Sequence, residues 1–361
     1  KSLAPHREWL GTKMKTPKRS GFTLVELLVV IGILSLLISI LLPTLGAARR
    51  SANAIKCASN LRAIGQGIAN YEANYGGAFP PSNYYVGLQI VNSSTQLPVL
   101  PTQGYVHWSS FLYRKTLSAN DPALLSTFGW EIFQCPSLQN GGVPPANTYA
   151  ANSDGLANEA GANVIDLQAP RMSYMLNEAL TPRSIFTANF RSGNVRYYHF
   201  IKAGRVSKPA ETILTSEMSG NQGAMRALSN FGGSTPVSNS RRPVSGISAS
   251  LSNPPLSSPD QGYTLPLGGT YGWATVDKLS VDPEATFANT SGIPTPDTTL
   301  DFIGRNHGVK THGIVAGSSR GGWDLRKSNF LYVDGHVETK HVAETVYPRS
   351  QWGGEFYSLE Q

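Results

Sequence analysis

The longest uninterrupted run of apolar positions in the chain lies near its beginning. From Phe22 to Leu42 there are 21 residues, and Glu26 is the one charged side chain among them. As an α-helix this run would be about 30 Å long, the thickness of the hydrocarbon core of a bilayer. A carboxylate inside such a segment is costly unless it has a partner, so we expect Glu26 to have a specific role.

Basic residues precede the apolar run. Four lysines and arginines lie between positions 13 and 19, and the positive-inside rule therefore predicts that residues 1–21 are cytoplasmic and that the rest lies outside the cytoplasm. A secretory signal peptide is one alternative, but the run is long for such a peptide and no small-residue cleavage site follows it soon. A plain membrane anchor is the stronger alternative, and the cost of burying Glu26 argues against it.

A helical period continues after the apolar run. Apolar side chains recur at intervals of three or four residues and form one stripe on a helix. They are Ala54, Ala58, Leu61, Ile64, Ile68, Tyr71 and Tyr75. Gly76 and Gly77 then provide a stop signal. We therefore predict a helix from Phe22 to Tyr75, about 80 Å long if straight, whose amphipathic second part packs against a globular head.

The head, residues 78–361, is predicted to be rich in β-strands. Segments with strand-like patterns are separated by residues rich in Pro, Gly, Asn and Ser. The predicted strands are Val195–Ile201, Thr212–Met218, Asn329–Asp334 and His336–Val342. Asp334 and Gly335 form a signal for a hairpin with a two-residue loop. Residues 228–266 lack periodicity, which predicts a long surface loop or mobile insertion.

The N-terminal pattern resembles a known processing signal. The segment KRSGFTLVELLVVIGIL, which begins at Lys18, resembles the class III signal of type IV pilins and type II secretion pseudopilins. The resemblance implies that a prepilin peptidase cuts after Gly21 and that the new N-terminal residue, Phe22, is N-methylated. It implies that Glu26 binds the amine of a neighbouring subunit and sets the axial register. Pro43 corresponds to a position at which the helix of many pilins bends or locally melts.

This first resemblance implies an α+β fold of lollipop shape, with a long helix packed on an antiparallel β-rich head. Residues 1–21 would be a cleaved cytoplasmic leader, 22–43 a transmembrane or filament-core helix, and 44–77 its amphipathic continuation. The head would be periplasmic, or on the cell surface after assembly.

The implied function is that of a structural subunit of a type IV pilus-like or type II secretion pseudopilus filament, held in the inner membrane by a single span before assembly. The implied partners are the prepilin peptidase, an inner-membrane assembly platform, copies of this chain and other pilins or pseudopilins. The alternative is a minor or tip subunit that binds a surface, a glycan or DNA, because the head is large for a major pilin.

A second resemblance covers the head. Segments such as CASNLRAIGQGIANYEANYGGAFPPS, IFQCPS, MSYMLNE and ETILTSEM resemble those of a large group of pilin-like proteins of planctomycete-type bacteria, whose closing signature is called H-X9-DG. In NFLYVDGHVETK the counterparts are Asp334, Gly335 and His336. His307, in RNHG, is the counterpart of the histidine, so the signature would span residues 305–340. His307 lies 27 residues before Asp334, and Val309–Lys327 would therefore be an insertion.

Charge restricts the classes of partner. The net charge is +7, but six basic residues and one acid precede Phe22, and 24 basic and 22 acidic residues remain without them. The basicity is therefore an N-terminal feature, which argues against a nucleic-acid-binding face. The 36 glycines and 24 prolines are typical of many turns and long loops rather than of a helical enzyme.

The chain has two cysteines, Cys57 and Cys135, and no CxxC metal motif. The residues alone leave open whether they form one disulfide or remain separate buried thiols. If the head lies outside the cytoplasm, as the resemblance implies, we expect a disulfide that joins a turn of the head to the helix. Such a crosslink is worth a few kcal/mol in the chain-entropy model.

Side chains that carry chemistry are sparse in the head. The densest group of potential metal ligands is His307, His312, His336 and His341 with Asp334. His336 and His341 are five residues apart on a predicted strand and should face opposite sides, which weakens a shared metal site. Asp334 and His336 are better explained as residues of a hairpin turn.

No catalytic residue, enzymatic activity or cofactor is expected. Ser, His and Asp are present without a G-x-S-x-G elbow, so composition alone does not indicate a hydrolase. Glu217 and Asp334 are weak candidates for paired carboxylates or a Ca²⁺ site, and no EF-hand-like spacing supports them. Trp108, Trp273 and Trp323 could line a glycan or peptide surface, although such residues more often fill a core.

Overall fold

The computed structural model describes residues 22–85, 105–113, 129–147, 166–181, 200–220, 226–228, 236–238, 240, 244, 246–249, 271–288 and 298–353. Gly21 and the leader therefore lie outside the described residues, as do residues 195–199 of one predicted strand. The chain divides into two units, Lys1–Arg49 and Arg50–Gln361.

The predicted long helix is confirmed as α1, Leu24–Asn74. The helix continues through Pro43, so no locally melted segment interrupts it. It ends at the two predicted glycines, Gly76 and Gly77, which have φ values of +65° and +83°. The Gly77 N–H donates to the Glu72 carbonyl at 2.7 Å. This bond from residue i to i−5 is the longer bond of a Schellman cap, which satisfies a free carbonyl at the helix end.

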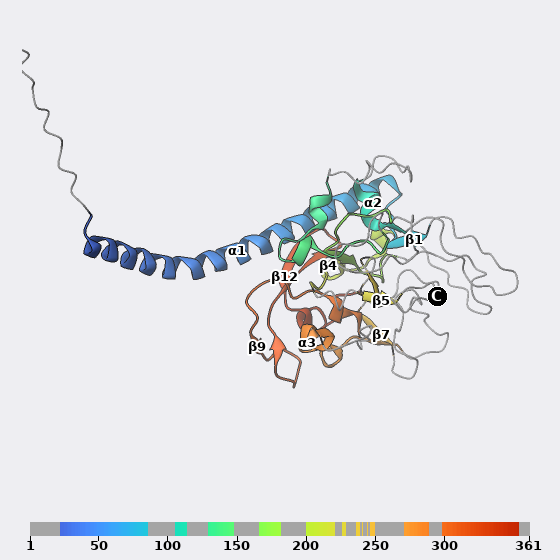
Figure 1. The fold of residues 1–361 in the computed structure, drawn as a ribbon. Helices are drawn as coiled ribbons and strands as arrows, with labels where there is room; N and C mark the ends of the chain where they lie inside the picture. Colours follow the sequence, from blue (N-terminus) through green and yellow to red (C-terminus); the bar gives the residue numbers. More distant parts are fainter. Residues whose placement is uncertain are drawn as a thin grey trace, which may run out of the picture. The chain divides into compact units, whose positions relative to one another are not determined.

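The second unit contains short strands and two short helices besides the second part of α1 (Figure 1). The strands are β1 (Asn83–Tyr85), β2 (Tyr105–His107), β3 (Tyr174–Leu176), β4 (Ile213–Glu217), β5 (Arg226–Leu228), β6 (Pro236–Ser238), β7 (Ile247–Ala249), β8 (Tyr271–Trp273), β9 (His312–Gly313), β10 (Trp323–Asp324), β11 (Ser328–Tyr332) and β12 (Val337–Lys340). The helices are α2 (Trp108–Tyr113) and α3 (Pro283–Ala288). Helix followed by antiparallel sheet confirms the α+β class.

The central sheet has the strand order β12-β11-β4-β3 and is antiparallel throughout. Strands β4 and β11 occupy its middle, and all five residues of each are buried. Both faces of these two strands are therefore covered, and the polar residues among them, such as Glu217 and Asn329, are buried together with the apolar ones. The remaining described strands form the two-stranded pairs β1–β2, β5–β6, β7–β8 and β9–β10.

Strands β11 and β12 form the predicted hairpin, but its loop has three residues instead of two. The Tyr332 N–H donates to the His336 carbonyl at 2.9 Å, so Val333, Asp334 and Gly335 form the loop. Gly335 has a φ of +92°. In a three-residue hairpin loop of this kind, a turn is followed by a residue with left-handed backbone conformation. Glycine adopts the left-handed conformation without strain.

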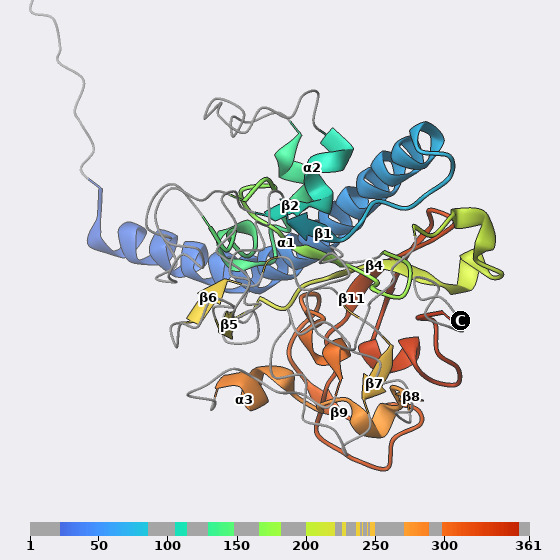
Figure 2. The ribbon, with the colours of Figure 1, turned by 90° about the vertical axis from the view of Figure 1, so that its right-hand side faces the viewer.

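Helix α1 covers one face of the central sheet. A Cβ on Gly65 would lie only 3.1 Å from Leu331 Cδ1, so glycine permits the close approach of α1 to β11. The other face contacts the C-terminal segment, where Phe330 and Trp352 meet edge to face with ring centroids 6.3 Å apart. In Figure 2, β4 and β11 lie between α1 and the region of α3, β7 and β9.

The buried stripe of α1 differs in part from the predicted one. It consists of Cys57, Asn60, Leu61, Ile64, Gly67, Ile68 and Tyr71. Ala54 and Ala58 are half-buried, and Tyr75 is 61% exposed because it lies beyond the last helical residue. The prediction placed only apolar residues in the stripe, so it missed the two polar or small positions, Asn60 and Gly67, that the packing also buries.

Some of the described residues in the range 228–266 lie in strands. These strands include the short β6 and β7, which pair with β5 and β8. The prediction of a continuous irregular segment is therefore wrong for these residues, because three-residue strands are too short to produce a visible period. Phe200 and Ile201 are the described residues of predicted strand 195–201 and have irregular backbone.

Candidate functional site

The first described turn of α1 contains a capping box formed by Thr23 and Glu26. The Glu26 carboxylate oxygen Oε2 accepts from the Thr23 N–H and from its hydroxyl, both at 2.8 Å. In return, the Glu26 N–H donates to Thr23 Oγ1 at 3.3 Å. The pattern T-x-x-E is a known sequence signal for a helix start. Thr23 is therefore a local partner of Glu26 that the sequence pattern could have predicted and that we did not expect.

The apolar part of α1 is exposed in the structure. Its side chains from Phe22 to Leu45 include no buried residue, and Phe22 itself is 74% exposed. Helix α1 is long and apolar enough to cross a membrane, as judged by length and composition. An apolar helix of this kind near the N-terminus supports membrane anchoring by a single span.

In the head, a disulfide joins Cys57 of α1 to Cys135, as expected. The two Cα atoms are 5.2 Å apart, and 78 positions separate the residues in the sequence. Two asparagines of α1 bind the same turn. Asn60 Nδ2 donates to the Gln134 carbonyl at 2.7 Å, and Asn53 Nδ2 donates to the Pro136 carbonyl at 3.4 Å. The turn around Cys135 is therefore attached to α1 by two hydrogen bonds as well as by the disulfide.

Next to the disulfide lies a buried cluster centred on Glu217, at the end of β4. Glu217 is completely buried, and its Oε1 is 2.8 Å from His307 Nε2. Asn329 donates to the carboxylate twice, from its backbone N–H to Oε2 and from Nδ2 to Oε1, both at 3.0 Å. Ser328 Oγ donates to Oε2 at 3.3 Å. The carboxylate is thus compensated by several donors, as a buried acid requires.

His307 connects this carboxylate to a residue nearer the surface. Its Nδ1 is 3.3 Å from Ser137 Oγ, and Ser137 is half-buried whereas His307 is 4% exposed. Its Nε2 lies 2.9 Å from Asn329 Nδ2 as well as 2.8 Å from Glu217 Oε1, and the position of the ring proton decides which nitrogen donates and which accepts. Burial and the charge of Glu217 together raise the pKa of the neighbouring Tyr174 well above its ordinary value.

The predicted pair of Glu217 and Asp334 is not formed. Glu217 pairs with Tyr174 at one end of β4, whereas Asp334 follows Tyr332, which pairs with Ile213 at the other end. Four residues of strand separate these ends, a distance of about 13 Å. Asp334 instead accepts from the ring of His336 at 2.5 Å within the hairpin loop. The two carboxylates therefore do not form one site.

The four histidines that we considered as a group have different surroundings. His307 belongs to the Glu217 cluster, and His336 stacks on Tyr332 with ring centroids 4.2 Å apart. His341 is buried, its Nε2 lies 2.7 Å from the Asp324 carbonyl, and its Nδ1 accepts from the Ala343 N–H. His312 is half exposed and lies 3.4 Å from Asp282. They do not form a shared metal site.

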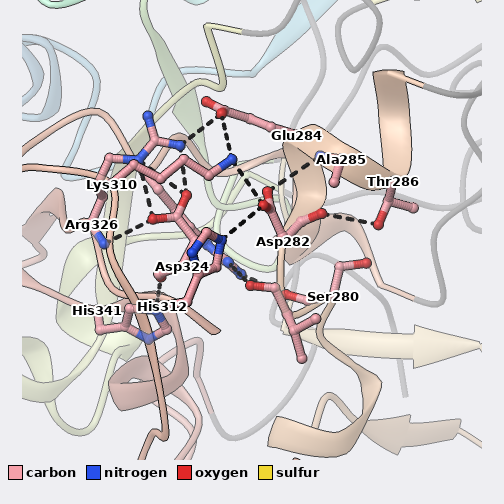
Figure 3. A network of polar contacts seen from close by, with 12 residues as sticks. Ser280, Asp282, Glu284, Ala285, Thr286, Lys310, His312, Asp324, Arg326 and His341 are labelled. Atoms are coloured by element: carbon pink, nitrogen blue, oxygen red, sulfur yellow. Dashed lines mark hydrogen bonds and ion pairs between the residues drawn. The ribbon is translucent and has the colours of Figure 1, made fainter. Parts of the chain in front are cut away.

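An ionic network surrounds α3 (Figure 3). Arg326 contacts Asp324 at 2.6 Å and Glu284 at 2.8 Å. Lys310 contacts Asp282 at 2.8 Å and Glu284 at 3.2 Å. Burial raises the pKa of Asp324, but the hydrogen bonds from Arg326 outweigh it, so the pKa is lowered. Each of the three carboxylates has a cationic partner, which makes the network a structural one rather than an open metal centre.

Two of the three tryptophans considered for a binding surface lie in the core. Trp108 and Trp323 are 1% and 0% exposed, and only Trp273 of the three is substantially exposed, at 38%. The indole N–H of Trp323 donates to the Arg320 carbonyl at 3.0 Å, and the Arg320 guanidinium lies over the ring. A surface formed by all three rings is therefore excluded, which corrects one of the alternatives above.

Comparison with known proteins identifies the N-terminal segment. Residues 16–42 match the family described as the prokaryotic N-terminal methylation motif. No curated protein and no solved structure is significantly similar to the chain. The motif supports a pilin-like protein that is a substrate of a prepilin peptidase, and it indicates a structural subunit rather than an enzyme.

Proposed function

We propose that the chain is a prepilin-like structural subunit that is cut between Gly21 and Phe22 and then assembles into a filament through α1. The observation that carries the proposal is the methylation motif over residues 16–42, which coincides with an exposed apolar helix whose single carboxylate follows Phe22 by four positions. In this proposal residues 1–21 are cytoplasmic, the helix spans the inner membrane before assembly, and the head is periplasmic.

The pairing of the helix with the head supports the same function. The buried stripe of α1 and the Cys57–Cys135 disulfide attach residues 57–71 to the sheet, while the apolar residues before them remain exposed. A filament core built from exposed apolar helices would bury this surface. The favourable free energy of burial is roughly proportional to the apolar area removed from water. Assembly partners would be copies of this chain or other pilins, delivered by an inner-membrane assembly platform.

The position of His307 supports the proposed counterpart of the H-X9-DG histidine. His307 and Lys327 exchange backbone hydrogen bonds at 3.0 and 2.9 Å. The two ends of segment 309–326 therefore lie next to each other, and this segment forms an excursion from the sheet. His307 is thereby brought to the start of β11, despite its distance from Asp334 in the sequence. We infer that the excursion is an insertion into the signature.

The size of the second unit favours a second candidate function. The unit Arg50–Gln361 contains most of the chain, and a bulky head limits side-by-side packing along a filament. A minor or tip subunit that binds a surface, a glycan or DNA is therefore the alternative on the same anchor. Electron microscopy of isolated filaments separates the two: a uniform repeat of this chain along the shaft supports a major subunit, and a low copy number at the end supports the alternative.

The processing step is tested by Gly21→Val, with Gly32→Val as the matched control. Gly32 lies in the same apolar segment and has open space around it. Mass spectrometry of the N-terminal peptide should find methylated Phe22 at the terminus of the wild type and of the control, whereas Gly21→Val should retain its leader. A processed Gly21→Val variant that forms normal filaments would be evidence against the proposed function.

A further inference from the structure

Four side chains of the kind that bind zinc converge in the buried cluster of the head. The sulfur atoms of Cys57 and Cys135, one carboxylate oxygen of Glu217 and one ring nitrogen of His307 all lie within 4.8 Å of one another. The first three residues are 0% exposed and His307 is 4% exposed. Two thiolates, an imidazole and a carboxylate are a ligand set that suits tetrahedral Zn²⁺.

The four ligands come from four separate segments that the fold holds rigidly. Cys57 lies on α1, Cys135 follows the 3₁₀ helix Trp130–Phe133, and Glu217 ends β4. His307 is held by its two backbone hydrogen bonds with Lys327. The Cys135 turn is also attached without the sulfur–sulfur bond, because the Cys135 N–H donates to Ser173 Oγ at 2.9 Å and Asn60 of α1 donates to the Gln134 carbonyl; breaking the bond therefore need not disperse the set.

Residues around the cluster already orient the two ligands that are not cysteines. Ser137 Oγ lies 3.3 Å from His307 Nδ1, and Asn329 holds the Glu217 carboxylate with two hydrogen bonds. Metal-bound histidines usually make a second hydrogen bond through their other nitrogen, and ligating carboxylates are likewise hydrogen-bonded. With a metal on Nε2, the ring proton would be on Nδ1, which would donate to Ser137 Oγ.

The dimensions of the cluster are compatible with an ion. Zinc bonds of about 2.0–2.3 Å at tetrahedral angles place the ligand atoms roughly 3.3–3.8 Å apart. The upper limit of 4.8 Å between the four atoms leaves room for this arrangement. The His307–Glu217 contact of 2.8 Å would open slightly to admit the ion.

We propose that the dithiol form of the head binds one Zn²⁺ through Cys57, Cys135, His307 and Glu217, and that disulfide formation expels the ion. On binding, the two thiols release two protons and become thiolates. On oxidation by a small disulfide, the two cysteine thiolates form one S–S bond, the oxidant is reduced to two thiolates that take up two protons from solvent, and Zn²⁺ leaves. The ion would attach the Cys135 turn to α1 before the covalent bond does so.

The proposal is tested with the full-length protein in detergent, reduced, freed of reductant without air and titrated with Co²⁺. Reduced wild type should bind one equivalent with a thiolate-to-cobalt charge-transfer band and the strong visible absorption of tetrahedral cobalt, and Zn²⁺ should displace it. Bound Zn²⁺ should also slow oxidation of the two thiols by a small disulfide, because a thiolate bound to the ion is less free to attack. The oxidised protein should show neither absorption feature.

Variants separate a four-ligand site from adventitious binding by two thiols. His307→Gln and Glu217→Gln should each weaken Zn²⁺ binding by at least about 10–100-fold, the loss that removal of an outer-shell partner already causes, and should alter the cobalt spectrum. The matched controls are His336→Gln and Asp334→Asn, which alter a second His–carboxylate pair in the exposed hairpin loop. These controls should leave the Zn²⁺ affinity and the cobalt spectrum unchanged. Absence of a tetrahedral cobalt spectrum in reduced wild type would overturn the proposal. An unchanged spectrum and affinity in folded His307→Gln and Glu217→Gln would also overturn it. If those variants do not fold, Ser137→Ala replaces them, because it removes the partner of His307 Nδ1 and should weaken Zn²⁺ binding about 10–100-fold; unchanged affinity would overturn the proposal.

Discussion

The Glu26 carboxylate accepts hydrogen bonds from both the N–H and the hydroxyl of Thr23, each at 2.8 Å. In this conformation the acid caps its own helix, although its proposed partner is the amine of a neighbouring Phe22. The two roles are compatible, because a helix N-terminus attracts a carboxylate and the processed amine would compete for the same oxygens.

The variants Glu26→Ala and Thr23→Ala distinguish these two roles. We expect Glu26→Ala to be cut normally but to form few filaments, because the amine of the neighbouring subunit loses its partner. Thr23→Ala removes only the cap, at a cost of about 0.5–2 kcal/mol to the helix, and should still assemble. Quantitative electron microscopy of filaments provides the measurement. Equal defects in both variants would assign the role of Glu26 to capping, and normal filaments from Glu26→Ala would refute its role in register.

Removal of the disulfide should destabilise the head without abolishing the fold. The bond closes a sequence separation of 78 positions, and loss of a native disulfide costs about 2–5 kcal/mol. We expect the double variant Cys57→Ser/Cys135→Ser to show this loss in denaturant unfolding. Reducing agent, in the presence of a zinc chelator, should lower the stability of the wild type and leave that of the double variant unchanged. Equal sensitivity of both proteins to reductant would contradict the prediction.

Asp324 should contribute to stability in a pH-dependent manner. Its side chain is fully buried beside Arg326, so we expect Asp324→Asn to cost about 3 kcal/mol at pH 7, the lower end of the range for breaking a buried pair, because Arg326 keeps Glu284 as a second anion. The pKa of Asp324 is lowered on folding. Its stabilisation is therefore present above the unfolded pKa and is lost as the pH falls through the folded one.

Denaturant unfolding at pH 7 and in the acid range measures this contribution of Asp324. The cost of Asp324→Asn should be largest at pH 7 and should shrink toward pH 2 as the wild-type carboxylate becomes protonated. Asp334→Asn serves as the control in the exposed hairpin loop and should change stability by less than about 1 kcal/mol. A cost that is independent of pH would indicate that packing, rather than charge, makes Asp324 important.

Glu72 should have the opposite pH dependence. Burial raises the pKa of this residue, near the end of α1, to about 7. The folded state therefore binds more protons than the unfolded state, and this residue reduces stability as the pH rises from about 4.5 to 7. After allowance for solvent screening of a half-buried group, Glu72→Gln should stabilise the protein by about 1–2 kcal/mol at pH 8.

The control for Glu72 is Glu211, whose side chain is bonded to Arg349 and whose pKa is lowered. Glu211→Gln should give no gain of stability at pH 8. Thermal or denaturant unfolding of both variants at pH 5 and pH 8 tests the sign. A Glu72→Gln gain that is as large at pH 5 as at pH 8 would show that charge is not its cause.

The sequence alone determined the features that depend on near neighbours. The apolar run and the stop at Gly76 and Gly77 predicted α1 to within two residues at either end, and the Asp334–Gly335 signal predicted a hairpin. These predictions succeeded because helix periodicity, helix caps and tight turns are formed by residues only a few positions apart. The same local pattern also contained the T-x-x-E cap at Thr23, which we did not recognise.

Only the tertiary structure decided which distant residues meet. Glu217 and Asp334 were only weak candidates for a pair, and the register of β4 against β11 places these residues at opposite ends and gives Glu217 the ring of His307, 90 positions away. The backbone bridge between His307 and Lys327 brings that ring to the start of β11. Strand register and loop closure are set by the packing of the whole head, so no spacing along the chain could reveal that Glu217, His307 and the disulfide share one buried cluster.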